Sequence, residues 1–274
     1  LLRPMHQEPS GVWIMAYTTI DDPSAHFQTA IYTGNGGSLA VTNDGNSDLQ
    51  PDLVWIKVRS LTSSHAIHDT SRGRIYLLTS NTNATDDDGT NAAVDEDLVS
   101  FDSDGITLGT AYHGRHNADS ATYVAWQWKA NGGTRTTFTE SGDNPAGGYQ
   151  ANTTAGFSII DYTGTGANGT VAHGLGVAPK CIIIKRRNDT ESWIVGHDGI
   201  VLGTGRLQLD TTAANGTGNA DAYYNTTAPS STVVSLGDHD AVNGNDDTYI
   251  IYAFAPIQGY SKFGSYTGNG NADG

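Results

Sequence analysis

The chain has 274 residues, of which 37% are hydrophobic and only 16% charged, with a formal net charge of −15. This length allows one or two domains, and the low charged fraction excludes a coiled coil or a charge-rich disordered chain. The acidic balance disfavours nucleic-acid binding, because a field of that sign repels phosphate. The single cysteine, Cys181, excludes an intrachain disulfide and is expected to be a small buried hydrophobe. No apolar run is long enough for a transmembrane helix, so no membrane insertion is expected.

Residues 1–14 are expected to be an N-terminal extension ahead of Met15, the expected natural start. They lack the basic and apolar stretches of a signal peptide. Short apolar runs bounded by turn residues then predict strands, and the sequence LVWIKV alternates with the period of two that a strand requires. The segment 81–97 is expected to be an exposed loop. The predicted strands lie near residues 27–33, 53–59, 64–69, 74–79, 98–101, 105–109 and 121–129.

Residues 131–155 are rich in Gly, Asn and Thr and are interpreted as a linker. A second series of strands follows, and no segment sustains the apolar spacing of an amphipathic helix. These strands are predicted near residues 157–163, 180–187, 192–197, 206–210, 232–236 and 248–255.

The two series of strands carry the same landmarks in the same order, at offsets of about 130 residues. The paired landmarks are Tyr32 and Tyr162, Pro51 and Pro179, Lys57 and Lys185, His68 and His197, Leu108 and Leu236, and Tyr123 and Tyr249. The sequence therefore predicts an all-β chain of two tandem antiparallel β-sandwich (jelly-roll-like) modules, at residues 15–130 and 156–259. Residues 260–274 are interpreted as the start of a third repeat or a C-terminal tail, which would make the chain part of a longer protein.

Each copy has the motif Tyr-Thr-Gly-x-Gly at the end of its opening strand. Glycine permits positive φ and a tight reversal, so these corners are expected to turn the chain and to hold no ligand. The corner glycines are Gly34, Gly36, Gly164, Gly166, Gly268 and Gly270.

The sequence of the repeats resembles a module of bacteriophage virion proteins that is frequent in phages of marine bacteria and cyanobacteria. The resemblance rests on YTGNG, QPDLVWIK, SFDSDGITLG and TYVAWQWKANGG in the first copy, and on FSIIDYTGTGANG, APKCIIIKRRN and TYIIYAF in the second. It covers about residues 15–274. It implies a non-enzymatic structural protein of the virion, usually a tail-fibre or appendage component made in the bacterial cytoplasm. It also implies other virion proteins as partners and a homo-oligomer, with a trimer favoured, and it offers no catalytic motif and no cofactor.

Two segments have residue types that bind metals. His113, His116 and Asp119 could hold a metal ion, although an exposed polar loop is the preferred interpretation. The runs 86–89 and 102–105 are similar to calcium loops but lack a closing Glu, so weak Ca²⁺ binding by the loop 86–97 is left open and a solvated loop is preferred.

Two other patterns suggest chemistry that their context disfavours. Residues 164–169 match G-x-G-x-x-G, yet the sequence after them cannot form the helix that a dinucleotide site needs. The recurring pairs His68-Asp69 and His197-Asp198, with Ser64, suggest a hydrolase triad. Adjacent residues of a strand face opposite sides, however, so a structural role is expected.

The preferred hypothesis is therefore a tail-fibre or appendage protein involved in host attachment. Its exposed loops, at 81–97, 111–119 and 211–222, would meet a host glycan or protein. A capsid decoration or connector protein is one alternative, and a polysaccharide-degrading appendage enzyme is another.

Overall fold

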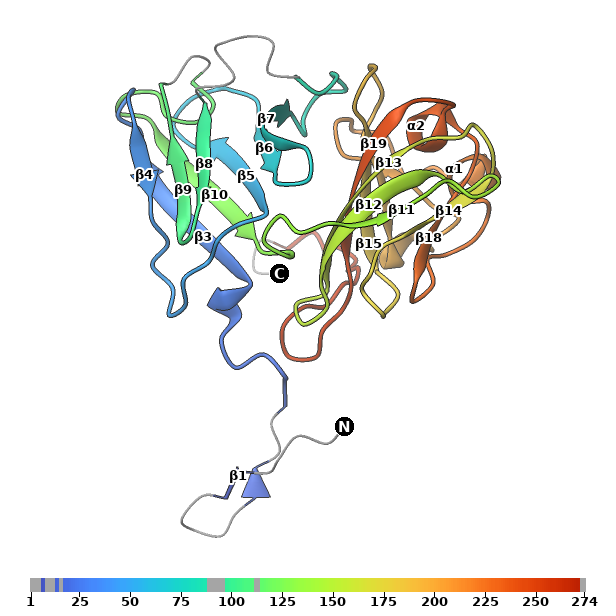
Figure 1. Cartoon of the computed structure of the whole chain (residues 1–274), viewed down its shortest axis with the longest axis horizontal. Helices are drawn as coiled ribbons and strands as arrows, with labels where there is room; N and C mark the ends of the chain where they lie inside the picture. Colours follow the sequence, from blue (N-terminus) through green and yellow to red (C-terminus); the bar gives the residue numbers. More distant parts are fainter. Residues whose placement is uncertain (1–5, 8–12, 15–16, 88–96, 111–113, 272–274) are drawn as a thin grey trace.

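The computed structural model describes residues 6–7, 13–14, 17–87, 97–110 and 114–271, and it is built almost entirely of antiparallel β-sheet. The prediction of an all-β sandwich fold is confirmed. Figure 1 shows two β-rich halves side by side, coloured blue to green and lime to red. No helix among the described residues has the length and apolar content to cross a membrane.

The first half is a sandwich of a large and a small sheet, counted within the described residues. A 3₁₀ turn at Pro23–Ala25 precedes the large sheet, and a separate hairpin pairs β1 (His6–Gln7) with β2 (Trp13–Ile14). The large sheet has the order β3 (Phe27–Thr33), β10 (Thr122–Trp128), β5 (Leu53–Val58), β6 (Ala66–Asp69) and β7 (Gly73–Leu78). The small sheet has the order β4 (Leu39–Val41), β9 (Gly105–Leu108) and β8 (Leu98–Asp102).

The second half has the same plan with a wider large sheet. Within the part of the chain that is described, its order is β11 (Thr136–Phe138), β12 (Ala146–Asn152), β13 (Phe157–Thr163), β19 (Thr248–Phe254), β15 (Cys181–Arg186), β16 (Ile194–His197) and β17 (Leu207–Gln208). The small layer consists of β14 (Gly169–Ala172), β18 (Val233–Leu236), α1 (Ala220–Tyr224) and α2 (Asp240–Asn243). A 3₁₀ turn at Asp198–Ile200 follows β16.

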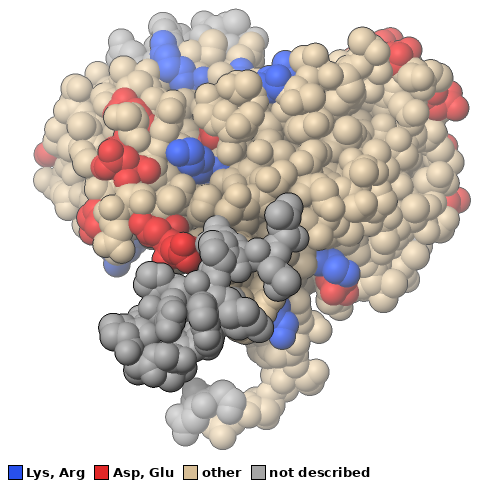
Figure 2. Space-filling view, turned by 60° about the horizontal axis from the view of Figure 1, so that its bottom comes forward, with Lys and Arg blue, Asp and Glu red and all other residues tan. Residues whose placement is uncertain are grey.

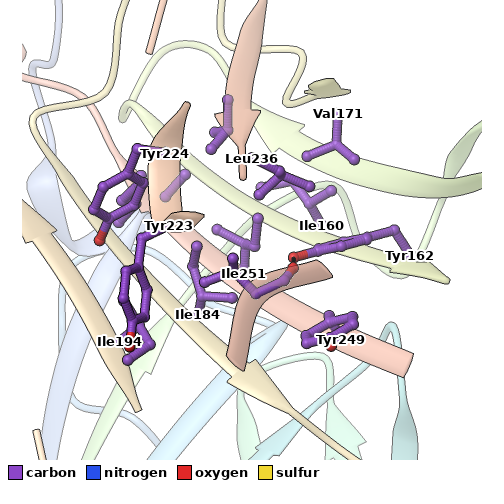
Figure 3. Close-up of a cluster of buried hydrophobic side chains, with 14 of the residues drawn as sticks. Ile160, Tyr162, Val171, Ile184, Ile194, Tyr223, Tyr224, Leu236, Tyr249 and Ile251 are labelled. Atoms are coloured by element: carbon purple, nitrogen blue, oxygen red, sulfur yellow. Dashed lines mark hydrogen bonds between the residues drawn. The ribbon is translucent and has the colours of Figure 1, made fainter. Parts of the chain in front are cut away.

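Each half buries its own core because its strands alternate buried and partly exposed residues, as β10 does along its whole length. In the second half, Val171 and Leu236 of the small sheet face Ile160, Ile184 and Ile251 of the large one (Figure 3). The first half packs in the same way between its two sheets.

The strand pairing is the same in both halves. Tyr123 of β10 lies opposite Tyr32 of β3, and Tyr249 of β19 lies opposite Tyr162 of β13. The registers on the other side of these central strands and on the next strand also match, at sequence offsets of 126 to 130. Equivalent positions of the two halves can therefore be compared residue by residue.

The segment predicted as a linker contributes two strands instead. β11 and β12 lie within residues 131–155 and extend the large sheet beyond β13. The glycines of β12, which contributed to the linker interpretation, allow close packing: a Cβ at Gly147 would lie 2.1 Å from the carbonyl oxygen of Asp161.

The chain enters the folded body beside the turn at Gly259, and the residues after this turn continue along the second half, where Phe263 packs against His197. Tyr17 and Thr18 pack against the turn at Gly259, where an added Cβ would lie 2.7 Å from Cβ of Thr18. On the face shown in Figure 2, acidic side chains form small separate groups and most of the surface carries no charge.

Candidate functional site

The Tyr-Thr-Gly-x-Gly corners attach the opening strand to the loop ahead of the central strand. The amide of Gly36 donates to the carbonyl of Asn117 over 2.9 Å, and that of Gly166 donates to the carbonyl of Asn243 over 2.8 Å. The side-chain oxygens of these two buried asparagines accept the amides of Asn35 and Thr165. Each corner is therefore held by the same hydrogen bonds in both halves.

Sterics explain the glycines at these corners. Gly36 and Gly166 have φ of 69° and 70°, as the turn prediction requires. Gly34 and Gly164 have a different reason, since a Cβ at either would lie 2.3 Å from a carbonyl oxygen of the facing loop. The third corner has φ of 73° at Gly270, and no atom lies within 4 Å of a Cβ placed at Gly268 or Gly270.

Tyrosine pairs complete the two corners. The rings of Tyr32 and Tyr123 stack with centroids 5.0 Å apart, as do those of Tyr162 and Tyr249. Tyr123 donates its hydroxyl proton to the carbonyl of Gly114 and accepts the amide of Ala118. Tyr249 makes the equivalent contacts with Asp240 and Gly244.

Residues 164–169 do not open a helix. β14 begins at Gly169, directly after the corner, so no helix N-terminus faces the glycines. The arrangement lacks the strand-turn-helix geometry that binds a pyrophosphate.

The repeated lysines, Lys57 and Lys185, donate hydrogen bonds to backbone carbonyls near the ends of their own strands. Lys57 Nζ donates to the carbonyls of Val58 and Ser63, each over 2.9 Å. Lys185 Nζ donates to the carbonyl of Arg186 over 2.6 Å, and burial lowers the pKa of this amine to about 8.

The pair His68-Asp69 splits between the two faces of β6. The Nε2 atoms of His68 and His116 are 2.9 Å apart inside the first half, and His116 Nδ1 lies 3.3 Å from Asp97 Oδ2. Burial and the charge of Arg72 lower the pKa of His68 to about 3. Ser64 instead contacts Asn81. In the second half, His197 Nδ1 accepts the amide of Gly199, so neither pair forms a triad.

The two candidate metal ligands that the structure describes, His116 and Asp119, differ in burial. His116 is buried beside His68, Asp119 is exposed, and His113 lies outside the described residues. The expectation of an exposed polar loop is therefore wrong at His116 and at the buried Asn117, which hold the corner. No group of three or more His, Cys, Asp or Glu suited to a metal ion occurs among the described residues.

The calcium-like runs supply structural acceptors where they are described. Asp102 accepts the hydroxyls of Ser100 and Thr107 within the β8–β9 hairpin, and Asp104 accepts the amide of Leu49. Asp86 binds arginines, and residues 88–96 lie outside the described part of the chain.

A buried ion cluster joins the two halves, and we call this contact the seam. Arg72 donates to Asp69 over 2.5 Å and to Asp86 over 2.8 Å, while Arg187 of the second half also binds Asp86 over 2.8 Å. The hydroxyl of Tyr252 donates to Asp69 over 2.7 Å. Burial opposes the charges of Asp69 and Arg72, but their attraction outweighs it and holds the carboxyl pKa low and the guanidinium pKa high.

Apolar side chains from both large sheets form the rest of the seam in one continuous cluster, which includes Leu53, Ile67 and Leu78 with Ile159, Ile250 and Tyr252. Fully buried Trp193 donates its indole N–H to the carbonyls of Thr79 and Thr82, each 3.1 Å away. The start of the predicted exposed loop thus exposes side chains, as at Asn83, while its backbone docks on the second half.

An apolar pocket of about 460 Å³ is lined by residues of the two large sheets and by Tyr260, Ser261 and Phe263. Equivalent residues of the two halves line it in pairs: Phe27 with Phe157, Leu53 with Cys181, Trp55 with Ile183, and Trp128 with Phe254. Burial raises the pKa of the Cys181 thiol to about 11, so it stays protonated at neutral pH. The size and aromatic walls suit an apolar or ring-bearing group.

A family model described as a domain of unknown function, DUF7483, matches residues 22–274. The chain belongs to the DUF7483 family. No curated protein matches, and no solved structure matches. The DUF7483 match spans both halves, the seam and the pocket.

Sequence reasoning found the corner residues of this DUF7483 chain but missed the seam. Arg72, Asp86 and Trp193 have no repeated counterpart of the same type, so the internal repeat gives no signal for them. A buried ion cluster also leaves no spacing signal, because its members come from distant segments.

Proposed function

We propose that this chain is a non-enzymatic structural protein of a bacteriophage particle, a tail-fibre or appendage component that takes part in host attachment. The proposal rests on the observation that the recurring polar residues have structural roles. The corner asparagines, tyrosines and lysines bond to the protein's own backbone at equivalent positions of both halves. Such a pattern serves a rigid fold, and the resemblance to virion modules supplies the context.

The seam supports the same proposal. A shared apolar cluster and a buried ion cluster join two sandwiches into one body, which suits a part that must keep its shape outside the cell. The aromatic pocket and the polar loops offer surfaces for other virion proteins or for a host glycan or protein. The proposed location is the virion, after synthesis in the bacterial cytoplasm, and the proposed state is a homo-oligomer.

Immunogold labelling of intact particles tests the proposal. Antibodies raised against the folded chain should decorate the tail appendages, and the signal should disappear after adsorption of the antibody with purified protein. Label on the capsid alone would favour a decoration or connector protein, and absence of label from particles in which the antigen is detectable would reject the virion assignment. Breakdown of host polysaccharide by the purified chain would favour the enzyme.

A further inference from the structure

Strand β3 forms an open edge of the first large sheet. Gly34 donates its amide to Ala121, and Lys129 donates to His26, so the even-numbered residues of β3 bond to β10. In an antiparallel ladder the amides and carbonyls of the alternate residues then point away from β10. Within the described part of the chain no strand pairs with that side. The outward-pointing groups belong to Phe27, Thr29, Ile31 and Thr33.

The second half shows the same edge occupied. β13 is the counterpart of β3, and β12 pairs with it over its full length, with Gly148 opposite Asp161 and Gln150 opposite Ile159. The fold therefore accepts an antiparallel strand at this position.

β3 lacks the features that usually protect an edge. Its sequence FQTAIYT has no lysine, proline or glycine, and its register with β10 is continuous. Ile31 is 68% exposed on this strand. An exposed, regular and uncharged edge strand is a template for pairing with another chain.

We propose that β3 pairs antiparallel with β3 of a second copy of this chain, around a two-fold axis at Ala30. In this register Ile31 lies opposite Thr29 of the partner subunit, and Phe27 lies opposite Thr33 of the partner subunit. All four outward-pointing residues of each strand then have a partner, because their positions are symmetric about residue 30. The strand carries no charge, so the excess of acidic groups does not act at the contact itself. Closed two-fold contacts of this kind are the commonest in homo-oligomers. The inference does not depend on the virion assignment.

Light scattering coupled to size-exclusion chromatography, over a series of concentrations, tests the association. The mass should rise to twice the 28.9 kDa of one chain. Ile31→Asp should stay a monomer, because it places two like charges near the axis. Val99→Asp, which changes an exposed β-branched residue of β8, should dimerise normally. A constant monomer, a trimer, or a dimer unaffected by Ile31→Asp would overturn the proposal.

Oxidation of the Ala30→Cys variant tests the register. Residues that face each other at a non-hydrogen-bonded site have Cα atoms about 4.5 Å apart, within the range of a disulfide. Ala30→Cys should therefore give a covalent dimer on a non-reducing gel. Val99→Cys, which also keeps Cys181, should not. Circular dichroism establishes that each variant is folded, and a folded Ala30→Cys dimer that does not cross-link would reject this pairing.

Discussion

The two halves share one architecture and differ where they meet other parts of the protein. Central strands, corners and lysines match position by position. On the outer face of the large sheet, however, Ile159 and Tyr252 are buried in the seam, whereas the equivalent Thr29 is exposed and Trp126 is only half-buried. The matched residues maintain the fold, and the diverged residues join the halves.

The interiors differ at one notable place. His68 and His116 of the first half stand where the second half has Gly196 and Val242, as the shared registers show. The predicted equivalence of His68 and His197 is therefore wrong by one residue, because His197 stands at the position of Asp69. The first half thus contains a buried polar pair where the second half is apolar. The experiments below probe these differences from the largest expected effect to the smallest.

Replacement of the seam tryptophan should have the largest effect. Trp193→Ala removes a fully buried side chain and the donor for two carbonyls, so the free energy of unfolding should fall by about 5 kcal/mol. His65→Ala changes the equivalent, half-buried position of the first half and should cost less than about 1 kcal/mol. Urea denaturation measures both values. Equal losses of stability in the two variants would mean that Trp193 contributes no more at the seam than His65 does at the equivalent position of the first half.

Removal of the seam cation should rank second. Arg72→Met leaves Asp69 buried without its cation, while Asp86 keeps Arg187, so a loss of about 3 kcal/mol is expected. Arg135→Met breaks a partly exposed pair with Asp161 and should cost less than about 1 kcal/mol. A loss for Arg72→Met no larger than for Arg135→Met in urea titrations would contradict the assigned role of the cluster.

The corner glycines should behave alike in both halves. Gly34→Ala and Gly164→Ala each force a methyl group against a carbonyl oxygen and should each destabilise by about 2 kcal/mol. Gly37→Ala is the control, because its nearest neighbour would be 3.9 Å away. Thermal and urea unfolding would show the effect, and a large difference between the two corners would argue against their equivalence.

The buried His68 should make the free energy of unfolding depend on pH. Folded His68, with its pKa near 3, stays neutral at pH 5, whereas the unfolded chain takes up a proton below about pH 6.5. The unfolded state then binds more protons, so stability should fall by about 1.4 kcal/mol per pH unit as the pH drops below 6.5.

Urea titrations between pH 7.5 and 5 measure this dependence. His68→Asn should flatten it, while His197→Asn, at the partly exposed histidine of the second half, should not. An unchanged slope in His68→Asn would assign the dependence to other groups.

Local patterns explain which strands were predictable. β5 and β10 alternate clearly, and Tyr-Thr-Gly-x-Gly marks corners that the chain forms twice. β4 and β14 are only three and four residues long, too short for periodicity to stand out. β12 was concealed by glycines that are required for close packing against β13.

The candidate site was less predictable, because tertiary contacts create it. Arg72, Asp86 and Arg187 meet only when the two sheets pack together. The pocket likewise depends on how the two halves pack together, although its walls come from equivalent positions of both. Repetition in the sequence pointed to the equivalent positions of the two halves, whereas the contact between the halves depends on residues that do not repeat.

The adjoining contact of Tyr17 with the turn at Gly259 has a mechanical consequence. Tension that entered at residue 17 and left beyond Phe263 would act first across this short contact and across the packing of Phe263 on His197, ahead of the strands of either sandwich. Both sandwiches would then lie beside the line of force, and their exposed faces would remain accessible without being stretched.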